Sequence, residues 1–234
     1  MDAIGGNGKG SPLLDKAAYP AAEIARLSGL SQARVRRWLR GYEYSYADEV
    51  RRQRPVIRRK GTKSTTYASF LDLIDLLFVK RFLDHGVSLQ KVRRALDEAA
   101  QILGTDHFAR KTFFTDGRNI YLEMKEKGEA ILQLLAGGQW VIAPIIQQLA
   151  HQIEFASPSG VAYRWYPMGS DGLVVLDPTI SFGRPTLRGR GVATSTVYDF
   201  YVAENENLEA ACSWMDLEKK EVEAVVEFEE RIAA

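Results

Sequence analysis

Apolar residues recur every three or four positions in two short segments near the start of the chain, and the turn Ser28–Leu30 separates them. This spacing predicts two amphipathic helices. The residues expected to face inward are Ile24, Leu27, Val35, Trp38 and Leu39. Pro20 suits the first turn of the first helix, and Ser31 suits the N-cap of the second. The stretch from Tyr19 to Tyr42 therefore predicts a helix-turn-helix.

Two longer helices are predicted further along the chain. Ser69 and Asp72 have the spacing of a capping box, and they precede an apolar run that ends at Gly86. The apolar face of this helix is wide enough to form core on one side and an interface on another. Ser88 begins a fourth helix, which stops at Gly104. Helices placed after a DNA-binding unit favour a homodimer, because two-fold DNA readers need one.

The helical period breaks between the second and third helices. Pro55–Ile57 and Thr65–Tyr67 look like short strands, and a basic loop, Arg58–Lys63, lies between them. We interpret this segment as a wing that reaches the DNA backbone beside the groove. The alternative is a disordered basic loop. In both cases the loop would add salt-dependent attraction to DNA.

The pattern changes again near His107. Two strand-like runs are joined by Asp116-Gly117, a strong hairpin signal, and a helix is expected around residues 129–135. Two short β-like runs follow, VAYRWYP (161–167) and LVVLDP (173–178). The segment contains no phosphate loop, paired catalytic carboxylates or Ser-His-Asp constellation, so we assign it to structure or sensing.

The last third of the chain predicts three helices after a turn-rich segment. Thr194 or Ser195 is expected to cap the first of these helices, and Cys212 is expected to be a small buried hydrophobe. The fold class is thus α+β and mainly helical. The expected regions are a flexible N-terminus (1–18), a winged helix-turn-helix with dimer-forming helices (19–106), a central α+β region (107–173) and a C-terminal three-helix unit (174–234).

Charge is distributed unevenly, although the net formal charge is only +1. Residues 26–63 hold twelve Lys or Arg against three Asp or Glu, a balance of +9. Residues 199–234 hold three basic against eleven acidic residues, a balance of −8. A basic front and an acidic tail indicate a nucleic-acid surface at one end and a different partner at the other.

Composition excludes several classes of site. Cys212 is the single cysteine, so no disulfide or thiolate zinc site forms within one chain. The three histidines are far apart, and we expect no metal, no cofactor and no enzymatic activity. The apolar runs are shorter than the roughly 20 residues that span a bilayer, so we expect a cytoplasmic protein without membrane contact.

Double-stranded DNA is the partner expected at the front. The second helix carries four arginines in seven residues, which favours DNA binding over a merely solvated helix. The residues expected to contact DNA are Ser31, Gln32, Arg34, Arg36, Arg37, Arg40 and Tyr42, with Arg58, Arg59, Lys60 and Lys63 in the wing.

The run YPAAEIARLSGLSQARVRRWLRGY, followed by the wing and SFLDLIDLLFVKRFLDHGVSLQKVRRAL, resembles the winged head of MerR-type regulators. In that family a Gly-x-Ser turn introduces another basic helix, as Gly86-Val87-Ser88 does here. The resemblance covers roughly Tyr19 to Gly104. It departs from the family at Arg37–Arg40, where an Arg-aromatic-Tyr-Glu run is usual. The resemblance implies DNA binding.

A second resemblance covers Val174 to about Ile232. This segment is similar to a small domain of unknown function that recurs in antitoxins of VapB type. The matching motifs are Asp177-Pro178, Gly183-Arg184-Pro185, Arg188-Gly189-Arg190-Gly191 and Ala193-Thr194. The resemblance implies pairing with a PIN-domain ribonuclease toxin. It makes Arg184, Arg188 and Arg190 candidates for contact with the toxin's carboxylates, the alternative being phosphate or fold contacts.

These features together predict a DNA-binding antitoxin that neutralises a PIN-domain toxin and represses its own operon. The acidic tail is expected either to mimic RNA or to meet a basic toxin surface. The alternative function is a free-standing MerR-like transcriptional regulator whose central region senses a small molecule. The C-terminal unit also has a helix-turn-helix-like pattern and is a second candidate DNA surface.

Overall fold

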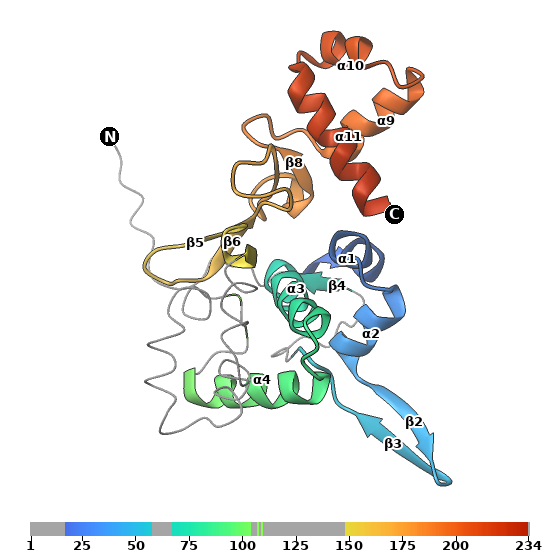
Figure 1. Cartoon of the computed structure of the whole chain (residues 1–234), viewed down its shortest axis with the longest axis vertical. Helices are drawn as coiled ribbons and strands as arrows, with labels where there is room; N and C mark the ends of the chain where they lie inside the picture. The colour runs from blue at the N-terminus through green and yellow to red at the C-terminus, as the bar shows by residue number, and fades with distance from the viewer. Residues whose placement is uncertain (1–16, 58–66, 104–106, 108, 110–147, 234) are drawn as a thin grey trace.

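The computed structural model describes residues 17–57, 67–103, 107, 109 and 148–233. These residues form both helices and antiparallel sheets, in agreement with the predicted α+β class (Figure 1). The predicted hairpin at Asp116-Gly117 and the helix expected at 129–135 lie outside the described residues.

The helix-turn-helix forms as predicted. Helices α1 (Ala21–Ser28) and α2 (Gln32–Arg40) bury the expected stripe of Ile24, Leu27, Val35, Trp38 and Leu39. Gly29 adopts a φ of 65° between them, a backbone conformation that glycine takes without strain. Strand β1 (Ala17–Pro20) precedes α1 and includes Ala17 and Ala18, which the sequence interpretation placed in the N-terminal segment.

The segment after α2 differs from the prediction. Strands β2 (Tyr42–Tyr46) and β3 (Glu49–Gln53) form an antiparallel hairpin, and β4 (Tyr67–Ser69) pairs with β1. The strand predicted at Pro55–Ile57 is wrong. The N–H groups of Val56 and Ile57 both donate to the Trp38 carbonyl, at 2.8 and 3.1 Å, and both side chains are buried. Val56 and Ile57 therefore pack against α2 instead of pairing with another strand.

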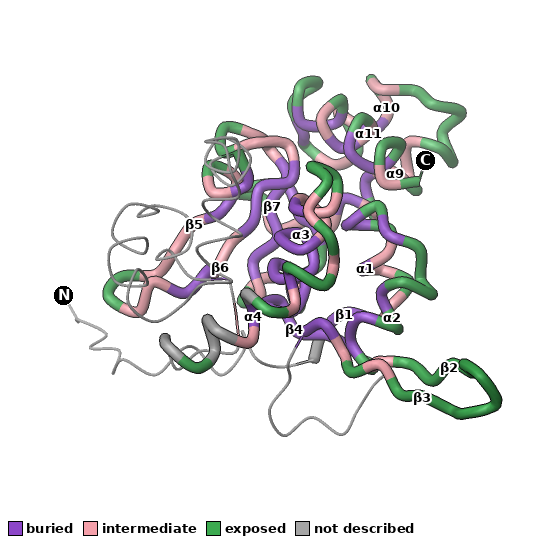
Figure 2. Tube along the Cα trace, turned by 60° about the horizontal axis from the view of Figure 1, so that its bottom comes forward, coloured by how far each residue is buried: buried purple, intermediate pink, exposed green. Residues whose placement is uncertain are grey.

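Helix α3 (Phe70–Asp84) lies at the centre of the N-terminal part of the chain (Figures 1 and 2). The predicted capping box is confirmed: the Asp72 N–H donates to Ser69 Oγ at 3.1 Å, and the Ser69 N–H donates to Asp72 Oδ2 at 2.8 Å. Helix α3 contacts α1, β1, β4, β6 and α4. Its wide apolar surface is thus covered by its own chain, and the expected second, intermolecular use of this face is not supported.

Helix α4 (Leu89–Leu103) begins at the predicted cap, because the Lys91 N–H donates to Ser88 Oγ at 3.4 Å. Val92 and Leu96 of this helix are buried in the same core as α3. The cap was readable from sequence because it is a local feature.

A four-stranded antiparallel sheet has the order β5-β6-β7-β8. Its strands are β5 (Ile153–Phe155), β6 (Ala162–Trp165), β7 (Val174–Leu176) and β8 (Pro185–Leu187). Strands β6 and β7 lie within the two predicted β-like runs. The Trp165–Leu176 pairing joins β6 to β7 across the boundary expected at residues 173 and 174. The sheet thus connects the central region to the C-terminal segment.

Helices α9 (Thr194–Ala203), α10 (Leu208–Met215) and α11 (Lys219–Ala233) form the predicted three-helix unit. A separate core supports it, built from Leu187, Val197, Ala211, Leu217, Val222 and Val225. Cys212 is half-buried and packs against this core. The expected cap of α9 by Thr194 or Ser195 is wrong. Ala193 is the N-cap, and the buried Thr194 hydroxyl donates to Glu229 Oε1 at 2.5 Å.

The N-terminal helices and the C-terminal unit meet at one junction. The buried Tyr19 hydroxyl donates to the Gly183 carbonyl at 2.7 Å, and burial raises the pKa of this tyrosine, so it stays a donor. Arg26 of α1 forms an ion pair with Glu229 of α11 at 3.4 Å. The front and the tail of the chain are therefore in direct contact.

Candidate nucleic-acid interface

The exposed face of α2 is the first part of the candidate interface. Gln32, Arg34, Arg36, Arg37 and Arg40 are all exposed, because Val35, Trp38 and Leu39 fix the opposite face in the core. Ser31 is also exposed, but its hydroxyl oxygen accepts the Arg34 N–H at 3.2 Å. Its structural role is therefore that of the N-cap.

Three of the α2 arginines, Arg34, Arg36 and Arg37, contact neutral groups. The Arg34 guanidinium lies 6.0 Å from the Trp38 ring centroid, and that of Arg37 lies 5.4 Å from the Tyr42 ring. Arg36 donates to Gln32 Oε1 at 3.3 Å. Rings and amides orient a guanidinium without neutralising it, so these three side chains keep the charge that attracts phosphate.

The β2–β3 hairpin is the second part of the interface, and it projects from the end of α2 (Figures 1 and 2). Alternation along a strand places Tyr42, Tyr44 and Tyr46 on one face. Arg51 is the cross-strand partner of Tyr44, and its guanidinium lies 4.8 Å from the Tyr46 ring centroid. We call these four residues the tyrosine face. Because Arg37 stacks on Tyr42, the tyrosine face continues the arginine face of α2.

The sequence interpretation did not include this hairpin, because it placed the wing between Pro55–Ile57 and Thr65–Tyr67. Tyr42 was the one hairpin residue expected to contact DNA. The hairpin turn is made by Ala47 and Asp48, with φ values of 49° and 61°, instead of the glycine-containing pairs that signal such turns. The useful signal was the alternation of tyrosine with polar residues. The expected wing contacts Arg58, Arg59, Lys60 and Lys63 lie outside the described residues.

Arg54, just after the hairpin, does not add to the basic surface in the same way. It forms an ion pair with Asp97 of α4, and its carbonyl accepts from Arg93 at 3.5 Å. This pairing links the base of the hairpin to α4 and offsets the charge of Arg54.

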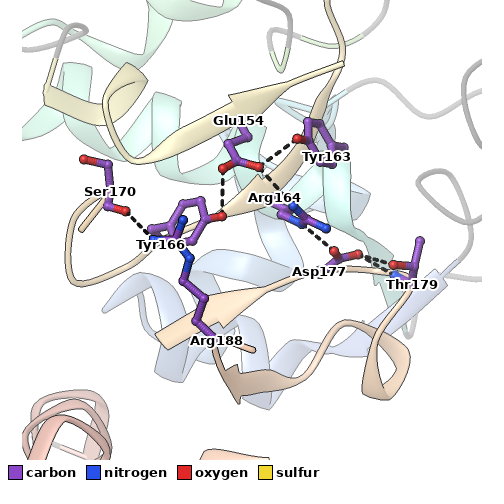
Figure 3. A network of polar contacts seen from close by, with 8 residues as sticks. All are labelled: Glu154, Tyr163, Arg164, Tyr166, Ser170, Asp177, Thr179 and Arg188. Carbon is purple, nitrogen blue, oxygen red and sulfur yellow. Dashed lines mark hydrogen bonds and ion pairs between the residues drawn. The ribbon is translucent and has the colours of Figure 1, made fainter. Parts of the chain in front are cut away.

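A polar network covers the middle of the four-stranded sheet (Figure 3). Glu154 accepts hydrogen bonds from Tyr163 and Tyr166 at 2.7 and 2.8 Å, and Arg164 joins Glu154 to Asp177. Burial alone would raise the pKa of Glu154, but these hydrogen bonds and the Arg164 charge outweigh it and lower the pKa. The network thus favours a charged, fully engaged carboxylate. Such a group ties β5, β6 and the end of β7 together.

The three arginines expected to contact a toxin lie in different environments. Arg190 makes a bidentate ion pair with the buried Glu221, at 3.0 and 3.1 Å. Arg188 donates to the Ser170 carbonyl at 3.1 Å and lies over the Tyr166 ring. Arg184 is exposed. Arg190 is therefore engaged in the fold, although all three arginines are exposed.

Comparison with known proteins now adds to the geometry. The chain is similar to a protein named "Putative antitoxin VapB45". That relative, from Mycobacterium tuberculosis (strain ATCC 25618 / H37Rv), is 27% identical over 195 residues, which cover 78% of this chain and 82% of the relative.

Two further comparisons bear on the front and on the fold. The "Uncharacterized HTH-type transcriptional regulator Rv1830" of the same strain is 40% identical over 88 residues, 37% of this chain and 38% of that protein. The crystal structure of Rv2018 from Mycobacterium tuberculosis superimposes with a TM-score of 0.68 at 22% identity, covering 91% of this chain and 99% of that one. The two chains therefore share a fold. No protein-family model matches the chain.

The two relatives are named an antitoxin and an HTH-type transcriptional regulator, and the second name agrees with the helix-turn-helix of α1 and α2. Within the described residues, no group of three His, Cys, Asp or Glu side chains is arranged to hold a metal ion. None of the described helices has the length and apolarity to cross a membrane.

Exposed aromatic residues at the tail were missed by the sequence reasoning. Trp214 is 77% exposed and Phe182 is 88% exposed. Because Trp214 follows small apolar residues in a helix, its sequence context suggests a buried side chain. In the structure, Ala211 is the buried residue of this helix instead. No local sequence signal distinguishes the two outcomes.

Proposed function

We propose that the chain is a DNA-binding antitoxin that neutralises a PIN-domain ribonuclease and represses its own operon. The observation that carries DNA binding is the exposed α2 face, where Arg34, Arg36 and Arg37 are held by rings and an amide. The antitoxin half is supported by the relative named as an antitoxin, which matches most of both chains.

On DNA, the α2 helix lies in the major groove and the β2–β3 hairpin extends along the duplex. Phosphate contacts by arginine set affinity and its salt dependence, while base contacts set the sequence that is read. The exposed face from Gln32 to Arg37 is the part of α2 that meets the bases. The MerR-like arrangement of this head and its action as a homodimer belong to the same proposal.

The test of DNA binding is the double variant Arg36→Ala/Arg37→Ala. Its affinity for operator DNA should fall at least tenfold, and the slope of log affinity against log salt should flatten by about one to two. Lys219→Ala/Lys220→Ala removes the same charge from exposed positions on α11 and should leave both quantities unchanged. Equal effects of the two variants would refute a specific role for α2.

The test of the antitoxin half is rescue of growth. Cells that express the PIN-domain ribonuclease encoded next to this chain should grow when the full chain is co-expressed, and the two proteins should purify as a complex. Arg184→Ala and Arg188→Ala should weaken the complex if these side chains reach the toxin's carboxylates. Absence of both rescue and complex formation would refute neutralisation.

The alternative is a free-standing transcriptional regulator, and the relative named as an HTH-type regulator favours it. The two functions separate in one experiment. A regulator of this kind represses from its operator without any toxin gene nearby, and its operator affinity changes with a small molecule. An antitoxin needs no such effector.

A further inference from the structure

Two aromatic side chains form a stacked pair at the surface of the C-terminal unit, one half-buried and one exposed. Trp214 of α10 stacks on Phe200 of α9, with ring centroids 6.0 Å apart and an interplanar angle of 13°. Phe200 covers one side of the indole, yet Trp214 remains 77% exposed. Exposed tryptophan is costly in water and is enriched at the centres of protein interfaces. The pair therefore indicates a docking surface.

The chain around this pair carries acidic residues but no basic ones. Residues 191–218 contain no Lys, Arg or His. They contain six acidic residues, all of them exposed: Asp199, Glu204, Glu206, Glu209, Asp216 and Glu218. These acids lie on α9, on α10, in the loop that joins them and in the residues that follow α10. A surface of this kind is complementary to a basic partner and repels nucleic acid.

Other carboxylates of the same unit have a different role. Glu221 is buried and bound to Arg190, and Glu229 is buried and bound to Thr194 and Arg26. By contrast, no described residue forms an ion pair with Asp199, Glu204, Glu206 or Glu209. Glu221 and Glu229 therefore stabilise the fold, whereas the four exposed carboxylates are available to a positively charged partner.

We propose that the Phe200–Trp214 pair and its surrounding carboxylates are the docking surface for a basic, RNA-binding protein, which is the ribonuclease of the proposed function. This inference rests on that function and names the surface that performs it. Stacked rings surrounded by negative charge offer the same chemistry as stacked bases flanked by phosphates. The surface therefore occupies the RNA path of the partner and competes with its substrate.

A second copy of this chain is the other candidate occupant, because its α2 face is basic. Such a contact would join the tail of one copy to the front of the next. A head-to-tail interface of this type does not close on itself unless the rotation permits a ring, and otherwise it grows into a filament. A distinct basic partner satisfies both the charge and the aromatic pair without this difficulty.

The experiment measures binding of the full-length chain to the ribonuclease encoded beside it, by calorimetry or surface plasmon resonance. Trp214→Ala should weaken the complex at least about thirtyfold, the effect of losing an interface hot spot. Trp214→Phe should retain most of the affinity. Operator binding should be unchanged in both variants, which shows that they are folded.

A matched control is Phe182→Ala, which removes an aromatic side chain that is still more exposed and lies outside the acidic stretch. It should bind the ribonuclease like the wild type. The fourfold variant Asp199→Asn/Glu204→Gln/Glu206→Gln/Glu209→Gln should slow association about tenfold at low salt, and the rate should become less sensitive to salt. Single-stranded RNA should compete with the wild-type chain for the ribonuclease.

The contrary outcomes are distinct. Wild-type affinity of Trp214→Ala for the ribonuclease, or no competition by RNA, would overturn this surface and leave neutralisation standing. Self-association of the chain alone that disappears in Trp214→Ala would assign the surface to a second copy and overturn the inference. Failure of the wild-type chain to bind the ribonuclease would overturn the proposed function and this inference with it.

Discussion

Buried carboxylates connect elements of this chain that lie far apart in sequence. Glu229 accepts the Thr194 hydroxyl and pairs with Arg26, while Asp75 of α3 pairs with His107 at 2.7 Å and accepts the Ala109 N–H at 2.9 Å. A buried charge that loses a partner cannot recover it from water. Single substitutions at these points should therefore have large effects.

Thr194→Val tests this directly. The substitution keeps the shape of the side chain but removes the donor to Glu229, so the free energy of unfolding should fall by about 1–3 kcal/mol. Urea denaturation followed by circular dichroism measures the change. Thr196→Val, at an exposed position of the same helix, is the matched control and should change stability little. Similar losses in both variants would contradict a special role for the Thr194–Glu229 bond.

Glu154 predicts how stability depends on pH. Its pKa is lowered in the folded chain from the ordinary value of 4.5, so its contribution is fully present above that value and is lost as pH falls through the folded pKa. Glu154→Gln should therefore reduce stability at pH 7 and flatten the loss of stability below about pH 4.5. Denaturation at a series of pH values measures both. If the variant loses stability below about pH 4.5 as steeply as the wild type does, the network of Figure 3 contributes nothing to stability.

Residue-scale features were predictable where their cause is local. The Ser69–Asp72 capping box and the Ser31 cap involve partners three residues apart, and the sequence shows both members. The Arg190–Glu221 pair joins residues 31 apart, so nothing in the motif around Arg190 indicated that its charge is used internally.

At the scale of elements, the β2–β3 hairpin has few packing contacts with the rest of the fold, and this exposure indicates its role. Two-stranded hairpins are marginally stable by themselves in water, and this one is almost wholly exposed. A hairpin that the fold does not need for its core indicates a role in contact with a partner. Its continuity with α2 through Arg37 and Tyr42 assigns that partner as DNA under the proposed function.

Tyr44→Ala/Tyr46→Ala tests the hairpin. Both side chains are exposed, so thermal stability should change little, whereas operator affinity should fall about threefold to thirtyfold through loss of contacts along the duplex. An electrophoretic mobility shift assay measures the affinity. Val50→Ala on the opposite face of the same hairpin should bind like the wild type. Equal losses from both faces would indicate that the substitutions only unfold the hairpin.

Elements were predicted well where hydrophobic periodicity is regular. Helices α1, α2, α3 and α4 and the three C-terminal helices each show a stripe or a cap in the sequence. The sheet pairing of β1 with β4 was not predictable, because about fifty residues separate two short strands. The strand at Pro55–Ile57 was predicted wrongly, because buried Val56 and Ile57 look like a strand when their contact with Trp38 is unknown.

At the scale of the whole molecule, the junction between front and tail depends on close packing around Gly183. This residue has a φ of 82°, and a Cβ atom added there would overlap the Tyr19 hydroxyl. The sequence motif Gly183-Arg184-Pro185 therefore has a structural explanation: glycine lets the turn before β8 approach β1.

Gly183→Ala should be strongly destabilising, by about 2 kcal/mol or more, because it combines backbone strain with loss of the Tyr19 contact. Gly189→Ala is the matched control: its φ of 79° imposes the same strain, but nothing lies within 4 Å of the added atom. It should cost about 1–2 kcal/mol. Thermal denaturation compares the two variants. Equal costs would show that the junction contributes little.

The junction has a consequence for regulation. Arg26 belongs to the helix that supports α2, and its partner Glu229 belongs to a helix of the unit that carries Trp214. If ribonuclease binding shifts α11, it changes operator affinity, and thermodynamics then requires operator DNA to change ribonuclease affinity by the same factor. Transcription from the operator would in that case report how much ribonuclease is bound, with no separate sensor.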